Sequence, residues 1–307
     1  MSFLPYLEPA CTKESEPAVE LEIDSRQRDL GDGFTVRRLL PSAARRTVGP
    51  FIFVDHMGPV HLSAGHGLDV RPHPHINLAT VTYLFEGEIL HRDSLGSEQP
   101  IRPGAVNWMT AGRGIVHSER SPSSERSLGP RVHGMQLWVA LPTAHEEDAP
   151  SFQHHAAATI PHVERPGARL RVIAGAAYGV TSPVAVLSPL FYVGAELDAG
   201  AELALPDEHR QRGAYVVGGA VSVDGKTFTE GSMLVFRERA PARLKALGAA
   251  RVMLLGGAPL DGERHIWWNF VSSSQERIER AKDDWRSGRF PKIPGDDVEF
   301  IPLPDSR

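Results

Sequence analysis

Two short pairs of side chains give this chain its most specific chemical signal. His73 and His75 form a His-x-His pair, and His117 and Glu119 form a His-x-Glu pair further along the chain. Alternate residues of an extended strand point to the same side, so each pair can present both side chains to one ion. The proline before each of the first two histidines favours the extended backbone that this requires. If the two segments lie side by side, four metal ligands converge.

Three imidazoles and one carboxylate form a borderline-to-hard ligand set. Such a set suits Fe(II), Mn(II), Ni(II), Co(II) or Zn(II), and iron is the usual choice where open coordination positions serve oxygen chemistry. Four protein ligands on a six-coordinate ion leave two positions for water, O₂ or a chelating substrate. We therefore expect a site for a single metal ion, with Fe(II) as the first candidate.

The His-x-His pair is a weak signal by itself. The chain has 14 histidines, enough for about one such pair to arise by chance. Surface or hydrogen-bonded histidines are the simpler interpretation of that pair alone. The second pair and the strand and turn signals between the two favour the metal site. The histidines at 56, 61, 66 and 91 lack paired spacing, and we expect capping or supporting roles for them.

The residues around the two pairs carry strand and turn signals. β-Branched and aromatic residues at 80–85 predict a strand that Gly87 ends, and a Pro103-Gly104 turn precedes another. Residues 56–59 contain Gly-Pro and predict a turn. Further strands are expected at residues 89–92, 106–110 and 135–141.

The second half of the chain is again rich in strand signals. Asp224-Gly225 predicts a tight hairpin, and residues 215–219 resemble residues 83–87 of the first half. Residues 143–168, rich in acids, histidine and proline, are interpreted as a linker or exposed arm. Short strands at regular intervals predict two small β-barrels or sandwiches.

Helical periodicity is found near the end of the sequence. Apolar residues recur at helical intervals over about residues 275–286, which predicts a helix, and Ser273 and Glu276 have capping-box spacing. The proline-rich tail after Pro291 is expected to lie extended against the body of the protein.

Composition narrows the classes of function. The 307 residues carry a formal net charge of −5 with no basic cluster, so we expect no direct nucleic-acid or membrane partner. Cys11 is the single cysteine, which excludes an internal disulfide. Because neither a signal peptide nor a long apolar run is evident, we expect a cytoplasmic protein.

The motif that contains the first pair resembles the first motif of the cupin superfamily. Gly67, His73-x-His75 and Gly87 fall into step with it, but Ala79 or Thr80 occupies the position of its glutamate. Within that superfamily the chain resembles the pirins, in which a carboxylate two residues after the second-motif histidine replaces that ligand. Glu119 stands there.

The resemblance to pirins covers nearly the whole chain and is strongest over residues 50–142. The run Trp108-Met109-Thr110-Ala111-Gly112-Arg113-Gly114-Ile115-Val116-His117-Ser118-Glu119 is close to the family signature, and residues 73–75, 82–84 and 136–139 also match. The resemblance implies an all-β bicupin: two tandem cupin-type β-barrels with a C-terminal helix. Residues 1–150 would form the metal-binding domain, and residues 151–307 a metal-free domain that carries the helix.

The resemblance also implies iron, held by His73, His75, His117 and Glu119, and two classes of function. Some bacterial members resemble quercetin 2,3-dioxygenases, which open a flavonol with O₂ and release carbon monoxide. Others act as redox-responsive iron proteins that work through protein partners and have no enzymatic role. A third possibility is a cupin that carries zinc or nickel and has no redox chemistry.

The enzyme hypothesis assigns roles to particular residues. A small aromatic substrate and O₂ would share the ion, and Glu119 would act both as ligand and as the base that accepts the substrate's hydroxyl proton. Candidate substrate contacts are Phe53, Met57, Met109 and Gln136. Trp108 is a further candidate, but a place in the barrel core is the preferred interpretation for it.

Overall fold

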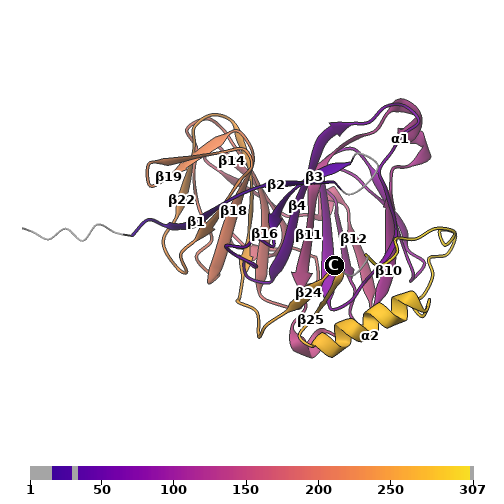
Figure 1. Cartoon of the computed structure of the whole chain (residues 1–307). Coiled ribbons are helices and arrows are strands. Elements are labelled where there is room, and N and C mark those ends of the chain that lie inside the picture. The colour runs from indigo at the N-terminus through magenta and orange to yellow at the C-terminus, as the bar shows by residue number, and fades with distance from the viewer. Residues whose placement is uncertain (1–15, 30–33, 305–307) are drawn as a thin grey trace, which may run out of the picture.

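The computed structural model describes residues 16–29 and 34–304. Figure 1 shows two β-barrels packed side by side, with one long helix and a C-terminal tail on the outside of the first barrel. The prediction of an all-β protein with two barrels and a C-terminal helix is confirmed. Among the described residues, no helix has both the length and the apolar character needed to cross a membrane.

The first barrel consists of a seven-stranded and a four-stranded antiparallel sheet, in the orders β12-β9-β6-β11-β4-β3-β2 and β5-β10-β7-β8. A short helix, α1 (Ser123–Leu128), precedes β11. The strands are β2 (Arg26–Asp29), β3 (Thr35–Leu40), β4 (Phe51–His61), β5 (Asp69–His75), β6 (Leu78–Glu86), β7 (Ile89–Asp93), β8 (Glu98–Ile101), β9 (Val106–Thr110), β10 (Ile115–Arg120), β11 (Arg131–Ala140) and β12 (Ser151–His155).

The second barrel has the same plan, with an eight-stranded sheet in the order β1-β21-β18-β23-β16-β14-β13, in which β15 pairs with β14, and a four-stranded sheet in the order β17-β22-β19-β20. The strands are β1 (Val19–Asp24), β13 (His162–Arg165), β14 (Ala168–Ala177), β15 (Val180–Thr181), β16 (Leu190–Leu197), β17 (Glu202–Ala204), β18 (Gln211–Gly218), β19 (Ala220–Val223), β20 (Lys226–Thr229), β21 (Ser232–Phe236), β22 (Arg243–Ala246) and β23 (Ala250–Gly257).

The chain passes between the barrels more than once. β1 pairs with β21 of the second barrel, whereas β12, which follows residue 150, pairs with β9 of the first. The interpretation of residues 143–168 as a linker is therefore wrong, because β12 and β13 both extend sheets. The sheets do not divide at residue 150, and the two-domain division there stays a prediction.

Apolar residues from both barrels form one continuous core at their interface. Tyr83 and Trp108 of the first barrel belong to the same buried cluster as Tyr192 and Tyr215 of the second. The preferred interpretation of Trp108 as a core residue is confirmed, since its side chain is 2% exposed. The interior of the second barrel is a separate apolar cluster.

Of the two turns predicted at glycine-containing segments, one is confirmed and the other is wrong. Asp224 and Gly225 both have positive φ and join β19 to β20, which confirms the tight hairpin. The turn expected at residues 56–59 is wrong, because β4 continues through it. Gly58, at φ +70°, forms a bulge there, and a Cβ atom on it would lie 2.1 Å from the carbonyl oxygen of Val132.

The C-terminal segment packs on the first barrel. It comprises the hairpin β24 (His265–Trp267) and β25 (Phe270–Ser272), followed by helix α2 (Gln275–Arg286) and the tail. The helix has the bounds that periodicity predicts, but its cap is Ser274, whose Oγ accepts a hydrogen bond from the backbone N–H of Arg277. The predicted box with Ser273 is wrong, because the Ser273 hydroxyl donates to buried Glu146 instead.

Candidate metal centre

The two predicted ligand segments lie side by side as β5 and β10. The strands are antiparallel, with His117 directly opposite His73, and a register shift separates His117 from Glu119. The prolines of β5 fit this arrangement because its half nearest the site is extended and buried. Strand pairing thus brings together two motifs that are about 40 residues apart in the sequence.

The three histidines form one compact cluster. The candidate ligand atoms of His73, His75 and His117 all lie within 4.8 Å of one another. Their ring centroids are 4.4–5.0 Å apart, and each side chain is almost wholly buried. Both ring nitrogens of His117 are buried with no hydrogen-bond partner among the described residues, a costly arrangement that a bound metal ion would relieve. The residues present therefore fit a metal ion.

Backbone carbonyls orient two of the rings. Nδ1 of His73 lies 2.8 Å from the carbonyl oxygen of Arg71, and Nδ1 of His75 lies 3.0 Å from that of Asn269. With Nδ1–H donating to a carbonyl, each ring leaves Nε2 as the free lone pair for an ion. The carbonyl of Asn269 comes from the loop that joins β24 to β25, far along the chain from β5.

Burial keeps the cluster neutral. Desolvation lowers the pKa of His73 to about 4 and lowers the pKa values of His75 and His117 well below the usual value, and the neighbouring imidazoles lower them further. Neutral imidazole is the form that binds a metal. The three rings are therefore ready to bind an ion at neutral pH without first releasing protons.

Glu119 lies close to this cluster but is bonded differently. Its buried carboxylate lines the same cavity as the three histidines, and Oε1 is 3.0 Å from the hydroxyl of Thr82. Burial raises the pKa of Glu119, while the charge of His91 and the bond from Thr82 oppose that rise. The compact cluster of ligand atoms contains the three histidines alone among the described residues, so coordination by Glu119 stays a prediction.

A cavity of about 540 Å³ opens onto the cluster. Phe53, Met57 and Gln136, three of the four predicted substrate contacts, line it. Met109, the fourth, does not line it. The alternation of β9 buries its side chain against Ala111 and Phe152 in a separate apolar cluster.

Aromatic rings form one wall of this cavity, and an ion pair lies beside them. Phe53 stacks on Trp138 with ring centroids 4.0 Å apart, and the Arg38 guanidinium lies 4.3 Å from the centre of the Phe53 ring. Arg38 also makes two hydrogen bonds to the buried carboxylate of Asp55. Desolvation raises the pKa of Asp55, although the bond from Arg38 favours its charged form.

Of two flanking histidines, His91 lies beside the ligand cluster, with its ring centroid 5.4 Å from that of His117, whereas His56 lies at the interface between the barrels. His91 Nε2 pairs with Asp93 at 3.1 Å, and its ring stacks on Phe152. His56 contacts the hydroxyl of Tyr215 in the second barrel.

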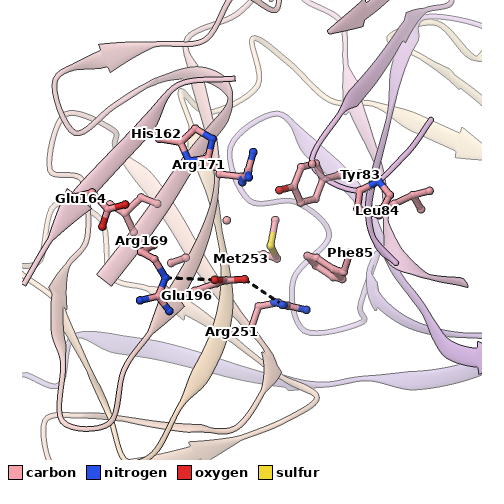
Figure 2. Close-up of a pocket in the computed structure, with 15 residues that line it drawn as sticks. Tyr83, Leu84, Phe85, His162, Glu164, Arg169, Arg171, Glu196, Arg251 and Met253 are labelled. Atoms are coloured by element: carbon pink, nitrogen blue, oxygen red, sulfur yellow. Dashed lines mark hydrogen bonds and ion pairs between the residues drawn. The ribbon is translucent and has the colours of Figure 1, made fainter. Parts of the chain in front are cut away.

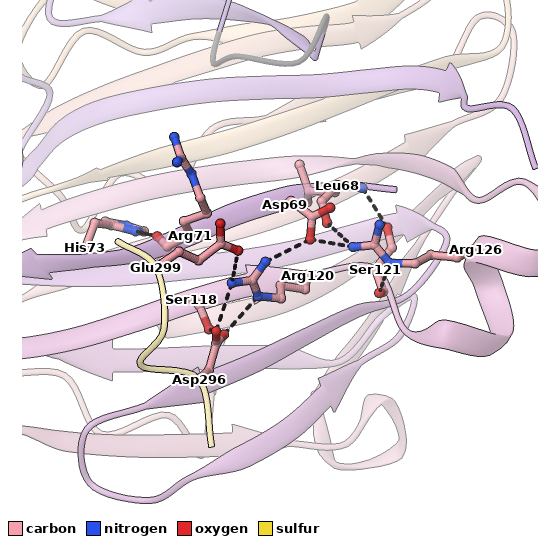
Figure 3. A network of polar contacts seen from close by, with 10 residues as sticks. All are labelled: Leu68, Asp69, Arg71, His73, Ser118, Arg120, Ser121, Arg126, Asp296 and Glu299. Carbon is pink, nitrogen blue, oxygen red and sulfur yellow. Dashed lines mark hydrogen bonds and ion pairs between the residues drawn. The ribbon is translucent and has the colours of Figure 1, made fainter. Parts of the chain in front are cut away.

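The outer faces of the two ligand strands are held by the C-terminal strap, which we define as residues 289–304. The carboxylate of Asp296 accepts hydrogen bonds from the Ser118 hydroxyl and from the Arg120 guanidinium (Figure 3). The N–H of Ile301 donates to the carbonyl of Pro72. Ser118 and Arg120 alternate with the two site residues of β10. The expectation that the tail lies against the body is confirmed as far as residue 304, the last that the structure describes, although a turn closed by the Asp296 N–H and the Ile293 carbonyl interrupts its extended course.

Comparison with known proteins places the chain in a family. Residues 33–139 match the family described as Pirin, and residues 192–291 match the Pirin C-terminal cupin domain. A "Pirin-like protein" of Caulobacter vibrioides is 54% identical over 291 residues, 94% of this chain and 100% of that protein. This chain belongs to the pirin family. The pirin resemblance and the bicupin fold predicted from the sequence are thereby confirmed.

Two other pirin-related proteins carry names that refer to an activity. A "Putative quercetin 2,3-dioxygenase" of Pseudomonas aeruginosa is 40% identical, covering 96% of this chain and 93% of that protein. A crystal structure named as quercetin 2,3-dioxygenase from Acinetobacter baumannii superimposes with a TM-score of 0.86 at 36% identity, covering 94% of this chain and 96% of that one.

Sequence reasoning missed the part of the pirin site that comes from the C-terminal segment. Ile266, Trp268, Asn269 and Ile301 all line the cavity, although they lie far from the ligand motifs in sequence. The Trp267-Trp268 pair was the one local signal, because exposed loops rarely carry two adjacent tryptophans without a packing partner. Trp138 was visible only as part of a matching family motif.

Proposed function

We propose that this pirin is an iron-dependent dioxygenase that opens a flavonol such as quercetin. The observation that carries the proposal is the cluster of three buried, neutral imidazoles at a cavity with an aromatic wall. The names of two relatives, given above, support the same substrate class. The nearby carboxylate of Glu119 completes the proposed ligand set with His73, His75 and His117.

Fe(II) is the proposed ion, and Mn, Ni, Co or Zn are the alternatives that the same ligand set accepts. Bound iron would supply Lewis acidity and a place for O₂ and substrate to meet. The chain's own contribution is a dry site, because each of the three imidazoles is buried and already neutral.

Glu119 is proposed as the group that accepts the hydroxyl proton of the flavonol. The Thr82 hydroxyl lies 3.0 Å from Glu119 Oε1 and 2.8 Å from Gln136 Oε1, but it has one proton and donates to one of them at a time. If the Gln136 amide turns by 180°, its nitrogen donates to Thr82, and Thr82 then donates to Glu119. When Glu119 takes up a proton, the amide returns to the orientation in which Gln136 Oε1 accepts from Thr82, and the protonated carboxyl of Glu119 donates to the Thr82 oxygen.

The aromatic wall would orient the substrate. A flat flavonol offers a face for the Phe53–Trp138 stack, and offset stacking of that kind contributes about 0.5–1.5 kcal/mol per ring pair. Met57 and Trp268 line the same cavity and exclude water from the reacting edge.

The proposal is tested by metal content and turnover together. Protein purified without an affinity tag is analysed for bound metals, loaded anaerobically with Fe(II), and assayed in air with quercetin for O₂ uptake and carbon monoxide release. We expect turnover in the wild-type protein, its loss in His75→Ala, and full activity in His66→Ala, an exposed histidine that serves as the matched control.

The same experiment separates the alternative function. Iron binding without turnover on quercetin or on other aromatic diols would reject the enzyme. It would favour a redox-responsive regulator that acts through a protein partner. If the purified protein contains zinc or nickel in place of iron, iron redox chemistry is rejected for the dioxygenase and for the regulator alike.

A further inference from the structure

A second cavity, of about 300 Å³, lies between the barrels (Figure 2). It is lined by β6 of the first barrel and by β13, β14, β16 and β23 of the second, and it shares no lining residue with the metal cavity. Neither the family match nor the proposed function gives this cavity a role.

Strand alternation explains its charged lining. On β14, β16 and β23, the side chains that face the first barrel are apolar where the barrels touch, as at Ile173, Tyr192 and Leu255. Further along the same faces stand Arg171 and Arg251. The charged residues therefore lie where the interface opens into the cavity. Gly194, opposite Arg171 in the register, leaves room there.

One cation in this cavity has no carboxylate partner. Glu196 is paired with Arg251 at 3.1 Å and with Arg169 at 3.6 Å, and Asp198 is paired with Arg169 at 3.2 Å, so these four charges compensate one another. Arg171 is half-buried, and its hydrogen bond to the carbonyl of Ala157 is long, at 3.4 Å. Across residues 16–29 and 34–304, no carboxylate forms an ion pair with Arg171.

A phenol lies next to this free guanidinium. Tyr83 is 5% exposed and lines the cavity, and no hydrogen bond to its hydroxyl is found within the described part of the chain. Figure 2 shows Arg171 between His162 and Tyr83. Burial raises the pKa of Tyr83, the charges of Arg171 and Arg251 oppose that rise, and the charge of Glu196 adds to it.

Part of the remaining lining is apolar. Phe85 presents its ring to Arg251, whose guanidinium carbon is 4.9 Å from the ring centre, and Met253 forms part of the floor. A ligand held by Arg171 and Tyr83 would therefore place its body against Phe85 and Met253.

We propose that this inter-barrel cavity binds a small organic monoanion, an aromatic carboxylate. The carboxylate would accept hydrogen bonds from Arg171 and from the Tyr83 hydroxyl, and the ring would pack on Phe85 and Met253. One uncompensated cation matches one negative charge. A phosphate dianion fits less well, because Glu164 and Glu196 also line the cavity.

The probe for this site is benzoate, titrated calorimetrically into the full, metal-loaded chain. We expect saturable binding that weakens about tenfold or more in Arg171→Gln and several-fold in Tyr83→Phe, since each change removes a donor to a charged group. Arg171→Lys retains the charge and should bind better than Arg171→Gln. Arg243→Gln is the matched control, because Arg243 is exposed, is paired with Glu202 and does not line the cavity, and it should change affinity less than twofold.

Further titrations distinguish other sources of a signal. Benzyl alcohol, which lacks the charge, and inorganic phosphate should both bind more weakly than benzoate. Binding should be unchanged in His75→Ala, so that the result is independent of the metal centre and of the proposed dioxygenase. The proposal is overturned if about 10 mM benzoate, enough to fill a millimolar site, gives no binding. Equal affinity in Arg171→Gln, or loss of binding in His75→Ala, would also overturn it.

Discussion

His117 differs from the other two histidines of the cluster in how its ring is held. His73 and His75 each place Nδ1 near a backbone carbonyl, whereas both ring nitrogens of His117 are buried and have no hydrogen-bond partner in residues 16–29 and 34–304. An unpaired buried imidazole costs free energy, and a coordinate bond to an ion would recover it. His117 is therefore the histidine whose removal should affect metal binding most directly.

At this scale the first prediction compares two ligands of the proposed set. We expect His117→Ala to weaken Fe(II) binding by at least about 100-fold. Removing only a group that orients a ligand already costs about 10–100-fold in metal affinity, and this change removes a ligand. Glu119→Gln should cost about tenfold, because an amide oxygen can still coordinate. The affinities are measured by anaerobic competition with a chromogenic chelator. Equal losses in the two variants would contradict the assignment of Glu119 as a simple fourth ligand.

The residues of this site differ in how far the sequence could predict them. His73 and His75 were predictable as a pair because i and i+2 on a strand share a face, a rule that needs no tertiary information. That His117 joins them depends on the pairing of β10 with β5. Met109 was mispredicted because β-strand alternation gives two faces and the sequence does not say which one meets the cavity. The contribution of Asn269 is a backbone carbonyl, which no side-chain pattern encodes.

At the scale of elements, the C-terminal strap supports the site from outside. Asp296 bonds to the residues that alternate with His117 and Glu119 along β10, and Ile301 bonds to the residue before His73. Burial alone would raise the pKa of Asp296, but the bonds from Arg120 and Ser118 outweigh it and lower that pKa. The carboxylate is therefore held in its charged form.

The second prediction concerns Asp296→Asn. Loss of the charge should loosen β10 and speed the transfer of bound metal to excess EDTA several-fold, while the ligands stay unchanged. Asp297→Asn is the matched control, because Asp297 contacts only Lys292, at 3.4 Å, within the part of the chain that the structure describes. The transfer is followed by the absorbance of a metal indicator. Identical rates in the two variants would show that the strap does not support the site.

Elements were predicted where local chemistry determines them. The hairpin at Asp224-Gly225 and helix α2 follow from backbone preferences and side-chain periodicity. β12 was missed because its residues are polar, and it becomes a strand by extending the edge of a sheet. The bulge at Gly58 was mistaken for a turn because Gly-Pro occurs in both settings, and only the partner strand distinguishes them.

At the scale of the whole molecule, a buried polar chain joins the barrels. His56 lies 2.7 Å from the Tyr215 hydroxyl and 2.9 Å from Nε2 of His133. Both ring nitrogens of His56 have a hydrogen-bond partner if the Tyr215 hydroxyl donates to Nδ1 of His56 and Nε2–H of His56 donates to His133. Desolvation, together with the charges of Arg37 and His133, lowers the pKa of His56 to about 2. The interface thus holds His56 neutral.

The third prediction follows from that pKa. Unfolded His56 binds a proton below about pH 6.5, but the folded protein resists this until about pH 2. The unfolded state therefore binds more protons over this range, and stability falls as the pH falls. His56 should contribute about 2 kcal/mol to the loss between pH 7 and pH 5. Urea unfolding of the wild-type protein and His56→Gln measures this.

His56→Gln should be less stable at pH 7, because its hydrogen bonds change, yet it should lose less stability on acidification. His66→Gln, at an exposed position, should retain the wild-type pH dependence. If His56→Gln and the wild-type protein show the same slope of stability against pH, the neutral state of His56 is not a property of the folded interface.

The dependence of His75 on the carbonyl of Asn269, 194 positions later, has a consequence for biosynthesis. A nascent chain that has left the ribosome as far as β12 has all three imidazoles but lacks the group that orients one of them. At that stage β1 also lacks its partner strand, because Val19 pairs with Phe236 of β21. Metal capture by a correctly oriented cluster must therefore follow translation of the second barrel rather than accompany translation of the first.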